Sequence, residues 1–433
     1  MNIVYMHTHD TGRYIEPYGV PVKSPRLKKF AKEGTLFRNA YCAGPTCSPS
    51  RAGLLTGMSP HNAGMIGLAH RGFSLTDNNK HLVQYLKKHN YVTALSGIQH
   101  VAKSGEEIGY DYVLTSKEER VGKAYDVANA KKACEFIESS KEQPFFLSFG
   151  MWNTHREFPE IHKSINPDYV TPPYPLADTP ENREDMAAFM SSLMVADECV
   201  GMVLDTLDRL ELRDETLVIF TTDHGIAFPR MKCNLYDTGI GVSLIMDYKG
   251  SKLKGKASDA LISHLDLFPT ICDIANIEKP DWLQGQSMVD LFEGDKEEIR
   301  EELFSEVSYH AAYEPKRCIR TKRYKLIKHY DVHDQIVPAN IDDSPGKSFL
   351  IEHDYLEYKV EREKLFDLYI DPVERVNLVN DERYSDIYQE LSHRLDKWME
   401  ETDDPLLNGQ IPLPEGAVAN KLSTISPKVM DWK

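Results

Sequence analysis

The sequence predicts a layered α/β domain followed by a smaller α+β subdomain. Over roughly the first 300 residues, short apolar runs rich in Val, Ile and Phe alternate with segments of helical periodicity. Apolar runs of this length are typical of central strands that are buried on both faces. After about residue 300, strand-like runs follow one another and a single amphipathic helix comes after them. We therefore expect two domains, at 1–305 and 306–433.

The elements of the first domain can be placed in order along the chain. Strands are expected at 2–7, 91–97, 143–152, 216–223 and 242–248. Helices are expected at 81–90, 184–210 and 266–277, with Pro269 in the first turn of the last one. Substrate specificity is expected to lie in loops, at 104–125, 157–184 and 332–356.

The second domain is expected to be a small sheet followed by a helix. ELFSEVSYH, KRCIRTKRYKLIKHY and KLFDLYIDP have the composition of strands with turns. The segment 386–402 is amphipathic at helical spacing.

Composition limits the partners and the compartment. The 433 residues carry a formal net charge of −16, which argues against nucleic acid or an anionic membrane as a partner. Seven cysteines are scattered without a CxxC pair, which disfavours a zinc ribbon or a disulfide scaffold. The chain opens on an apolar run without a basic start, and no apolar run approaches a membrane span of about 20 residues. We expect a cytoplasmic protein as written, unless a removed leader preceded Met1. Oligomeric state is left open.

Side chains able to do chemistry follow the predicted strand ends. Functional residues in such sheets gather at the carboxyl ends of strands, so we expect these groups to meet. They are His9, Asp10, His100, His155, Asp223 and His224, with Lys232 close behind and Cys47 and Arg51 near a predicted helix start at 49–51.

Each of these residues also has a plainer interpretation. A lone His after a strand is more often a hydrogen-bonded surface residue, Asp-His can cap a helix, and a lone Cys is usually a small buried residue. Together, carboxylates and imidazoles would bind a divalent cation, and Lys, Arg and His an oxyanion. The spacing alone favours a metal-assisted hydrolase.

One long segment points to a family. NAYCAGPTCSPSRAGLLTGMSPHNAG (39–64) resembles the signature of the type I, formylglycine-dependent sulfatases, in which Cys or Ser lies in a CxPxR core before Leu-Thr-Gly. The resemblance continues through NIVYMHTHDTG, PFFLSFGMWNTH, VIFTTDHG, ISHLDLFPTICDIANI and LFDLYIDPVERVNL. DHGIAFPRMKCNLY (223–236) looks most similar to the heparan N-sulfatase (sulfamidase) branch. The resemblance implies the alkaline phosphatase superfamily fold, a layered α/β/α domain with a large, mostly parallel central sheet.

The resemblance gives the cysteine a role. It implies that a maturation enzyme oxidises Cys47 to formylglycine, an aldehyde that a sequence does not display. The hydrate of this aldehyde carries two oxygens on one carbon, so that one can attack sulfur and the other can later expel sulfate. The resemblance further implies that Arg51 steadies the ionised hydrate by charge-assisted hydrogen bonding.

The remaining roles are also implied by the resemblance. Lys232 would hold sulfate oxygens, His155 would be the general acid at the leaving group, and His100 would deprotonate the hydrate. The metal ligands would be Asp10, Cys47 in its modified form, Asp223 and His224, with His9 as a further candidate, and hard oxygen ligands suggest calcium.

Three positions depart from the family pattern. His9 stands where a second Asp is usual, and His224 where Asn is more common. Because imidazole is a softer ligand, magnesium, manganese and zinc stay open. Ile98 replaces a usual Lys two residues before His100, and Lys103 is a candidate substitute.

Three functions are compatible with these residues. The favoured one is hydrolysis of a sulfate ester or sulfamate on a small sulfated sugar or oligosaccharide, with N-sulfated glucosamine, a glycosaminoglycan unit, preferred. The alternatives are a phosphoryl or phosphonate monoester hydrolase of the same superfamily, and a non-catalytic sulfated-glycan binder.

Overall fold

The computed structural model describes residues 1–120, 122–430 and 432, and it confirms the predicted fold class. An eight-stranded sheet forms the centre, with strand order β4-β3-β5-β1-β6-β7-β2-β8. Strand β7 runs antiparallel to β6 and β2, and the other neighbouring strands described in this sheet are parallel. The strands are β1 (Asn2–Thr8), β2 (Thr35–Tyr41), β3 (Val92–Gly97), β4 (Tyr112–Val113), β5 (Phe145–Gly150), β6 (Thr216–Thr222), β7 (Leu244–Asp247) and β8 (Lys256–Ser263).

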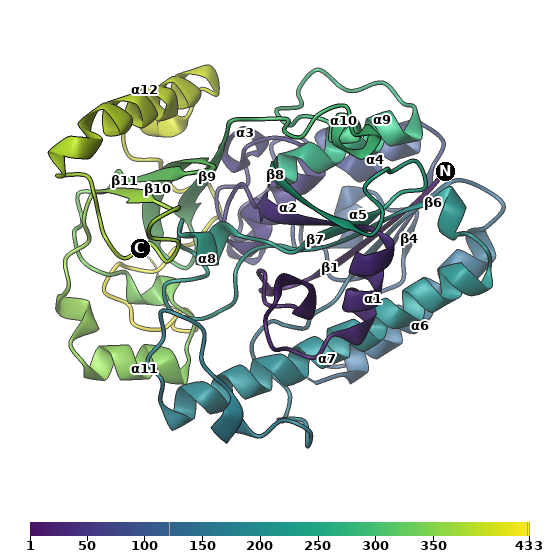
Figure 1. Cartoon of the computed structure of the whole chain (residues 1–433), viewed down its shortest axis with the longest axis horizontal. Helices are drawn as coiled ribbons and strands as arrows, with labels where there is room; N and C mark the ends of the chain where they lie inside the picture. Colours follow the sequence, from purple (N-terminus) through teal and green to yellow (C-terminus); the bar gives the residue numbers. More distant parts are fainter. Residues whose placement is uncertain (121, 431, 433) are drawn as a thin grey trace.

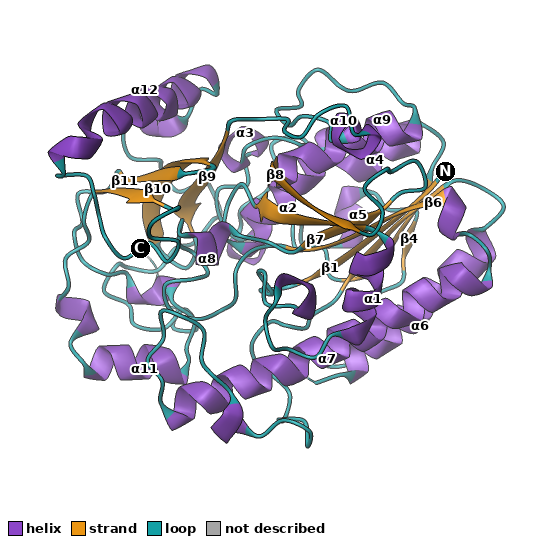
Figure 2. Cartoon of the chain, in the orientation of Figure 1, coloured by secondary structure: helices purple, strands orange, loops and turns teal. Residues whose placement is uncertain are grey.

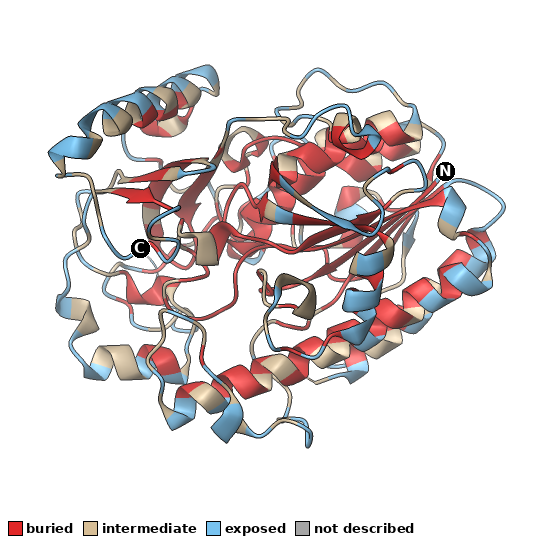
Figure 3. Cartoon of the chain, viewed as in Figure 1, coloured by how far each residue is buried: buried red, intermediate tan, exposed pale blue. Residues whose placement is uncertain are grey.

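Helices cover both faces of this sheet, as Figures 1 and 2 show. Successive residues of β1 point to opposite faces, so Ile3 and Tyr5 pack into one core, and Val4 and Met6 pack into the other. The first core includes residues of α2, α4 and α9, and the second includes residues of α1, α6 and α7. The helices of this domain are α1 (Pro25–Glu33), α2 (Cys47–Thr56), α3 (Pro60–Ala63), α4 (Leu82–Lys88), α5 (Gly105–Ile108), α6 (Ala124–Ser140), α7 (Pro180–Arg209), α8 (Asp237–Ile240), α9 (Leu267–Ala275) and α10 (Val289–Glu293). Figure 3 shows the large sheet as almost wholly buried, as expected for strands packed on both sides.

A second sheet of four antiparallel strands follows in the order β12-β11-β10-β9. Leu391 and Leu395 of the long helix α12 pack against Ile319, Leu326 and Leu365 of this sheet. The elements are β9 (Glu302–Tyr309), β10 (Tyr313–Thr321), β11 (Tyr324–His329), α11 (Pro345–Glu352), β12 (Glu363–Asp367) and α12 (Ser385–Glu401). The predicted small sheet and helix are both present. Strand β9 begins at Glu302, so the proposed boundary between 305 and 306 falls inside this strand.

Several expectations need correction. The structure also contains β2, β8, α1 and α6, which the sequence pattern did not predict. Helix α7 begins at Pro180 rather than at 184, because Thr179 caps it by accepting from the Asn182 N–H. The expected loops also carry short elements: 104–125 contains α5 and β4, with residue 121 outside the described part, and 332–356 contains α11.

Helix α7 is long and apolar enough, by length and composition, to pass as a membrane-spanning helix. Two thirds of its apolar window, 67 %, is buried inside the fold. Phe189, Leu193 and Val200 pack into the second core. Its apolar character therefore matches the pattern of a core helix.

Candidate active site

Two buried carboxylates lie where β1 and β6 end side by side. Asp10 follows β1 and Asp223 follows β6, and these strands are paired in parallel register up to Thr8 against Thr222. The Asp10 backbone N–H donates to Asp223 Oδ1 over 2.8 Å. Both side chains are fully buried. The parallel pairing therefore brings together two residues that are 213 positions apart in the sequence.

Arg51 holds Asp223 in place. Its NH2 group donates to Asp223 Oδ2 over 3.0 Å and to the Thr8 carbonyl over 3.1 Å, and its NH1 group contacts Nδ1 of His7. Burial opposes ionisation of Asp223, but the neighbouring His224 and Arg51 outweigh it and hold the pKa of Asp223 well below its ordinary value. The structure shows no direct hydrogen bond between Arg51 and Cys47 among the described contacts, so Arg51 reaches the cysteine through its charge and through Asp223.

Cys47 is the first residue of α2. The helix therefore starts two residues before the predicted position, and the positive end of its dipole lies at this thiol. The Cys47 Sγ atom lies 4.0 Å from Asp10 Oδ1, and the residue is 2 % exposed. Burial raises the pKa of the Cys47 thiol. An unmodified thiol in this place is protonated at neutral pH and is a weak nucleophile.

Lys232 comes from the loop between β6 and α8. Its ammonium donates to Asp10 Oδ2 over 2.9 Å and pairs with Asp342 Oδ2 over 3.1 Å. Burial opposes the charge, but Asp10 and Asp342 raise the pKa of Lys232 well above its ordinary value. The next residue, Cys233, donates its backbone N–H to the Pro45 carbonyl over 2.8 Å, which ties this loop to the segment before Cys47. A permanent cation thus lies beside the two central carboxylates.

Two histidines complete one side of the site. His155 Nε2 lies 4.0 Å from Asp10 Oδ2, and its ring lies 4.3 Å from the ring of Trp152. His100 stacks on His70, and His100 Nε2 lies 3.1 Å from His70 Nδ1. Burial lowers the pKa of both His100 and His155, which favours neutral rings at pH 7.

A pocket of about 570 Å³ opens next to these rings. Its volume is in the range of small-molecule sites. Ile98, which stands where the family usually has a lysine, and Lys103, the candidate substitute, both line this pocket. The other polar and aromatic lining residues include His70, Gln99, His100, Arg120, Trp152 and His155.

The carboxylates and nearby imidazoles fit a divalent cation. His224 Nε2 lies 3.3 Å from Asp10 Oδ1, and His9 Nδ1 lies 3.3 Å from Asp223 Oδ2. These two ring nitrogens are buried, and neither makes a hydrogen bond to any described residue. Buried nitrogens without partners beside two carboxylates are unusual in a folded protein, and a bound cation would satisfy them.

The structure brings together all of the residues that were picked from the sequence. Asp342 was missed, because it lies in a polar segment (332–356) that carries no recognisable motif. His70, which contacts His100, was missed because no predicted strand precedes it. His7 lies at the end of the first predicted strand, but the sequence gives no sign of its contact with Arg51.

The chain matches two family models. The sulfatase model matches residues 2–277, and the model described as N-sulphoglucosamine sulphohydrolase, C-terminal, matches residues 224–349. Among curated proteins, the chain is 29 % identical to N-sulphoglucosamine sulphohydrolase of Homo sapiens, over 93 % of this chain and 89 % of that protein. It is 27 % identical to an ulvan-active sulfatase of Formosa agariphila, over 100 % of this chain and 80 % of that protein.

Solved structures share the fold. One is a structure in complex with its substrate D-glucosamine-2-N,6-O-disulfate, and it has a TM-score of 0.72 at 19 % identity. This match covers 93 % of this chain and 98 % of the solved one. Another, a 2-O GAG sulfatase, has a TM-score of 0.73 at 22 % identity. This match covers 95 % of this chain and 94 % of the solved one.

Proposed function

The chain belongs to the sulfatase family and is a sulfuric ester hydrolase, and on this premise we propose that it removes sulfate from a sulfated sugar, with N-sulfated glucosamine as the favoured substrate. The human relative is named for that sugar, and the C-terminal model of the same name matches residues 224–349. One observation carries the proposal. Cys47, the two central carboxylates and the Lys232 ammonium converge on one buried point, with Cys47 Sγ 4.0 Å from Asp10 Oδ1 and Lys232 2.9 Å from Asp10 Oδ2.

Sulfatases generally use formylglycine and a divalent metal, and we propose both for this chain. Asp10, Asp223 and His224 would hold the metal, with His9 beside them, and calcium is preferred because carboxylate oxygens are hard ligands. The two imidazoles keep magnesium, manganese and zinc as rivals. A metal bound here would supply positive charge for the sulfate oxygens.

The second proposed group is formylglycine at position 47, made from Cys47 by a maturation enzyme. Its hydrate would supply one oxygen as the nucleophile and a second oxygen on the same carbon that can later expel the bound sulfate. The chain's own contribution is to position it: α2 presents residue 47 next to Asp10, and the charge of Arg51 favours an ionised oxygen there.

The other side chains have roles that follow from their positions. Lys232 would contact sulfate oxygens and stabilise the charge that builds up as the bond to sulfur breaks. His155 would give a proton to the leaving nitrogen or oxygen. Burial lowers its pKa, and the anionic substrate group would favour the protonated ring. His100, held neutral by burial, would accept a proton from the nucleophile.

The test is sulfate release from N-sulfated glucosamine beside its 6-O-sulfated isomer. The assay contains calcium, and peptide mass analysis confirms that residue 47 is converted. Release from the N-sulfate alone supports sulfamate cleavage, while release from the O-sulfate alone keeps the mechanism and changes the substrate. If neither sugar is cleaved although residue 47 is converted, aryl sulfate and aryl phosphate decide between other sulfate esters and phosphoryl transfer. Binding of sulfated glycan without turnover would favour a non-catalytic role.

A further inference from the structure

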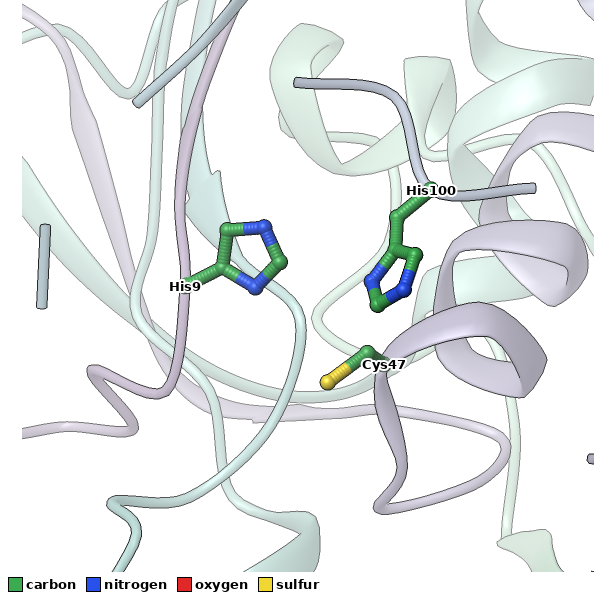
Figure 4. A group of neighbouring side chains, drawn as sticks. All are labelled: His9, Cys47 and His100. Atoms are coloured by element: carbon green, nitrogen blue, oxygen red, sulfur yellow. The ribbon is translucent and has the colours of Figure 1, made fainter. Parts of the chain in front are cut away.

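Cys47 belongs to two groups of possible metal ligands. One joins it to the carboxylates Asp10 and Asp223 and to His9. The other consists of His9, Cys47 and His100, with ligand atoms all within 4.8 Å of one another. Figure 4 shows the His9 and His100 rings on opposite sides of a space, with the Cys47 sulfur directed toward it. The second group contains no carboxylate, which distinguishes its chemistry from that of the first.

Each histidine of this second group has a buried ring nitrogen without a hydrogen-bond partner among the described residues. His9 is 0 % exposed, and both of its ring nitrogens lack a hydrogen-bond partner among the described residues. His100 Nδ1 is likewise buried without a partner. His100 Nε2 lies 3.1 Å from His70 Nδ1. If Nε2 donates to His70, the lone pair of His100 remains on Nδ1, the usual arrangement behind a metal-binding histidine.

We propose that the chain with unconverted Cys47 binds a borderline-soft divalent metal of the zinc class through Cys47 Sγ, His9 and His100. Zinc prefers sulfur and imidazole nitrogen, with bonds of about 2.3 Å and about 2.0–2.1 Å. A tetrahedral centre with those bonds places its ligand atoms about 3.5 Å apart. Small side-chain movements from the present spacing therefore close the site. The Cys47 S–H bond breaks, its proton goes to solvent and the sulfur forms the bond to the metal.

The proposal explains why a histidine at position 9 would alter the metal preference of the site. The sulfatase pattern has Asp at this position, and an Asp would add a third hard ligand to the carboxylate group. An imidazole instead lies within reach of the sulfur. Conversion of Cys47 replaces that sulfur by oxygen and removes the one soft ligand. The metal preference of the chain is thus expected to change from zinc before conversion to a harder cation afterwards.

Cobalt titration tests the proposal, because cobalt occupies such sites and reports sulfur ligation by a thiolate charge-transfer absorption. The sample is the full chain with residue 47 shown by mass to be an unconverted cysteine. We expect the absorption to appear with cobalt and to disappear when zinc is added. Cys47→Ser should remove it, and His9→Ala or His100→Ala should weaken cobalt affinity at least about tenfold. Cys42→Ser, which removes a buried thiol outside the group, should keep it.

Two outcomes would overturn the proposal. One is no charge-transfer absorption in the unconverted chain at saturating cobalt. The other is an absorption of equal strength in Cys47→Ser or in fully converted protein, which would place the sulfur ligand elsewhere. The converted sample needs no substitution, so the result does not depend on the folding of a variant. No substrate is used, and a failure here is separate from a failure of the proposed sulfatase substrate.

Discussion

The Cys47 site can be compared with a second buried group of charges, which we call the interface cluster: His61, Glu306, Arg317 and Asp404. This cluster joins α3 of the large domain to β9, β10 and the segment that follows α12. Both groups are buried and both contain carboxylates, a histidine and an arginine. They differ in how completely the protein satisfies them.

The interface cluster is satisfied throughout. His61 Nδ1 lies 2.6 Å from Glu306 Oε2, and its Nε2 lies 3.2 Å from the Thr402 carbonyl. Arg317 donates to both oxygens of Asp404, over 2.5 Å and 2.9 Å, and lies 3.2 Å from Glu306. None of these four side chains has a buried polar atom without a partner within the described residues.

The Cys47 site, in contrast, leaves atoms of His9, His100, His224 and Arg51 without partners in the described part of the chain. Such atoms are costly in a folded protein unless something else binds them. In this pair of clusters, the complete set of partners fits a role in stabilising the fold, and the incomplete set beside two carboxylates fits a place that binds a ligand. Four changes test this distinction, in order of decreasing expected effect.

The first change is Cys47→Ala. Because it removes the group from which the nucleophile is made, we expect turnover to fall below detection. The melting temperature should change little, since only one sulfur atom is lost. Sulfate release and thermal unfolding by circular dichroism measure the two effects. Substantial turnover in this variant would exclude residue 47 as the source of the nucleophile.

The second change is Arg317→Met in the interface cluster. It leaves Asp404 buried without its arginine and Glu306 with His61 alone, so the free energy of unfolding should fall by about 3–5 kcal/mol. The turnover number per folded molecule should stay the same. Denaturant unfolding measures the loss. Arg209→Met is the control, because Arg209 pairs with Glu138 on the surface and such pairs contribute about 0–1 kcal/mol. Equal losses in the two variants would contradict the comparison.

The third change is Lys232→Ala. It removes the cation at Asp10, and we expect the turnover number to fall by about 10²-fold or more. Lys325→Ala is the matched control, because Lys325 is also buried and paired with an aspartate, Asp237, but lies outside the proposed machinery. Steady-state kinetics on the preferred sugar compare the two. If Lys232→Ala keeps the wild-type rate, this lysine does not contact sulfate.

The fourth and smallest effect concerns pH. Burial opposes protonation of His61, but Glu306 outweighs it and raises the pKa of His61 above 6.5. A raised folded pKa gives stability that is complete below the unfolded value and is lost as pH rises through the folded value. The melting temperature difference between wild type and His61→Gln should therefore be larger at about pH 6 than at about pH 8.5.

His81→Gln supplies the control of opposite sign. Burial lowers the pKa of His81 to about 3. A lowered folded pKa costs stability as pH falls below the unfolded value, so wild type should lose stability relative to this variant in acid. A His61 difference that grew with rising pH would mean that its charge is not stabilised by Glu306.

The sequence predicts the sheet well where strands are uniformly apolar, as at β1, β5 and β6. It fails at β2 and β8, because half of β8 is exposed and polar and β2 carries Arg38 and Asn39 in its middle. Only their pairing with each other and the large sheet shows them to be strands.

The residues of the candidate site divide in the same way, according to whether an apolar strand next to them can be recognised in the sequence. Residues at the ends of apolar strands, such as Asp10 and Asp223, can be found because the strand itself is visible. Asp342 could not be found, because its role depends on a long loop that folds back onto Lys232. The role of Arg51 at the nucleophile stays a prediction, and its contacts with Asp223 and His7 could not be read from the sequence.

The distance along the chain between Cys47 and its covering residues has a consequence for synthesis. Asp342 closes the Lys232 side of the site, and about 300 residues separate it from Cys47. A ribosome that adds about 5–20 residues per second takes about 15–60 s to make that stretch. For this interval the cysteine has left the ribosome while part of its cover does not exist. This interval is the time during which the proposed conversion of Cys47 would meet an incompletely covered thiol.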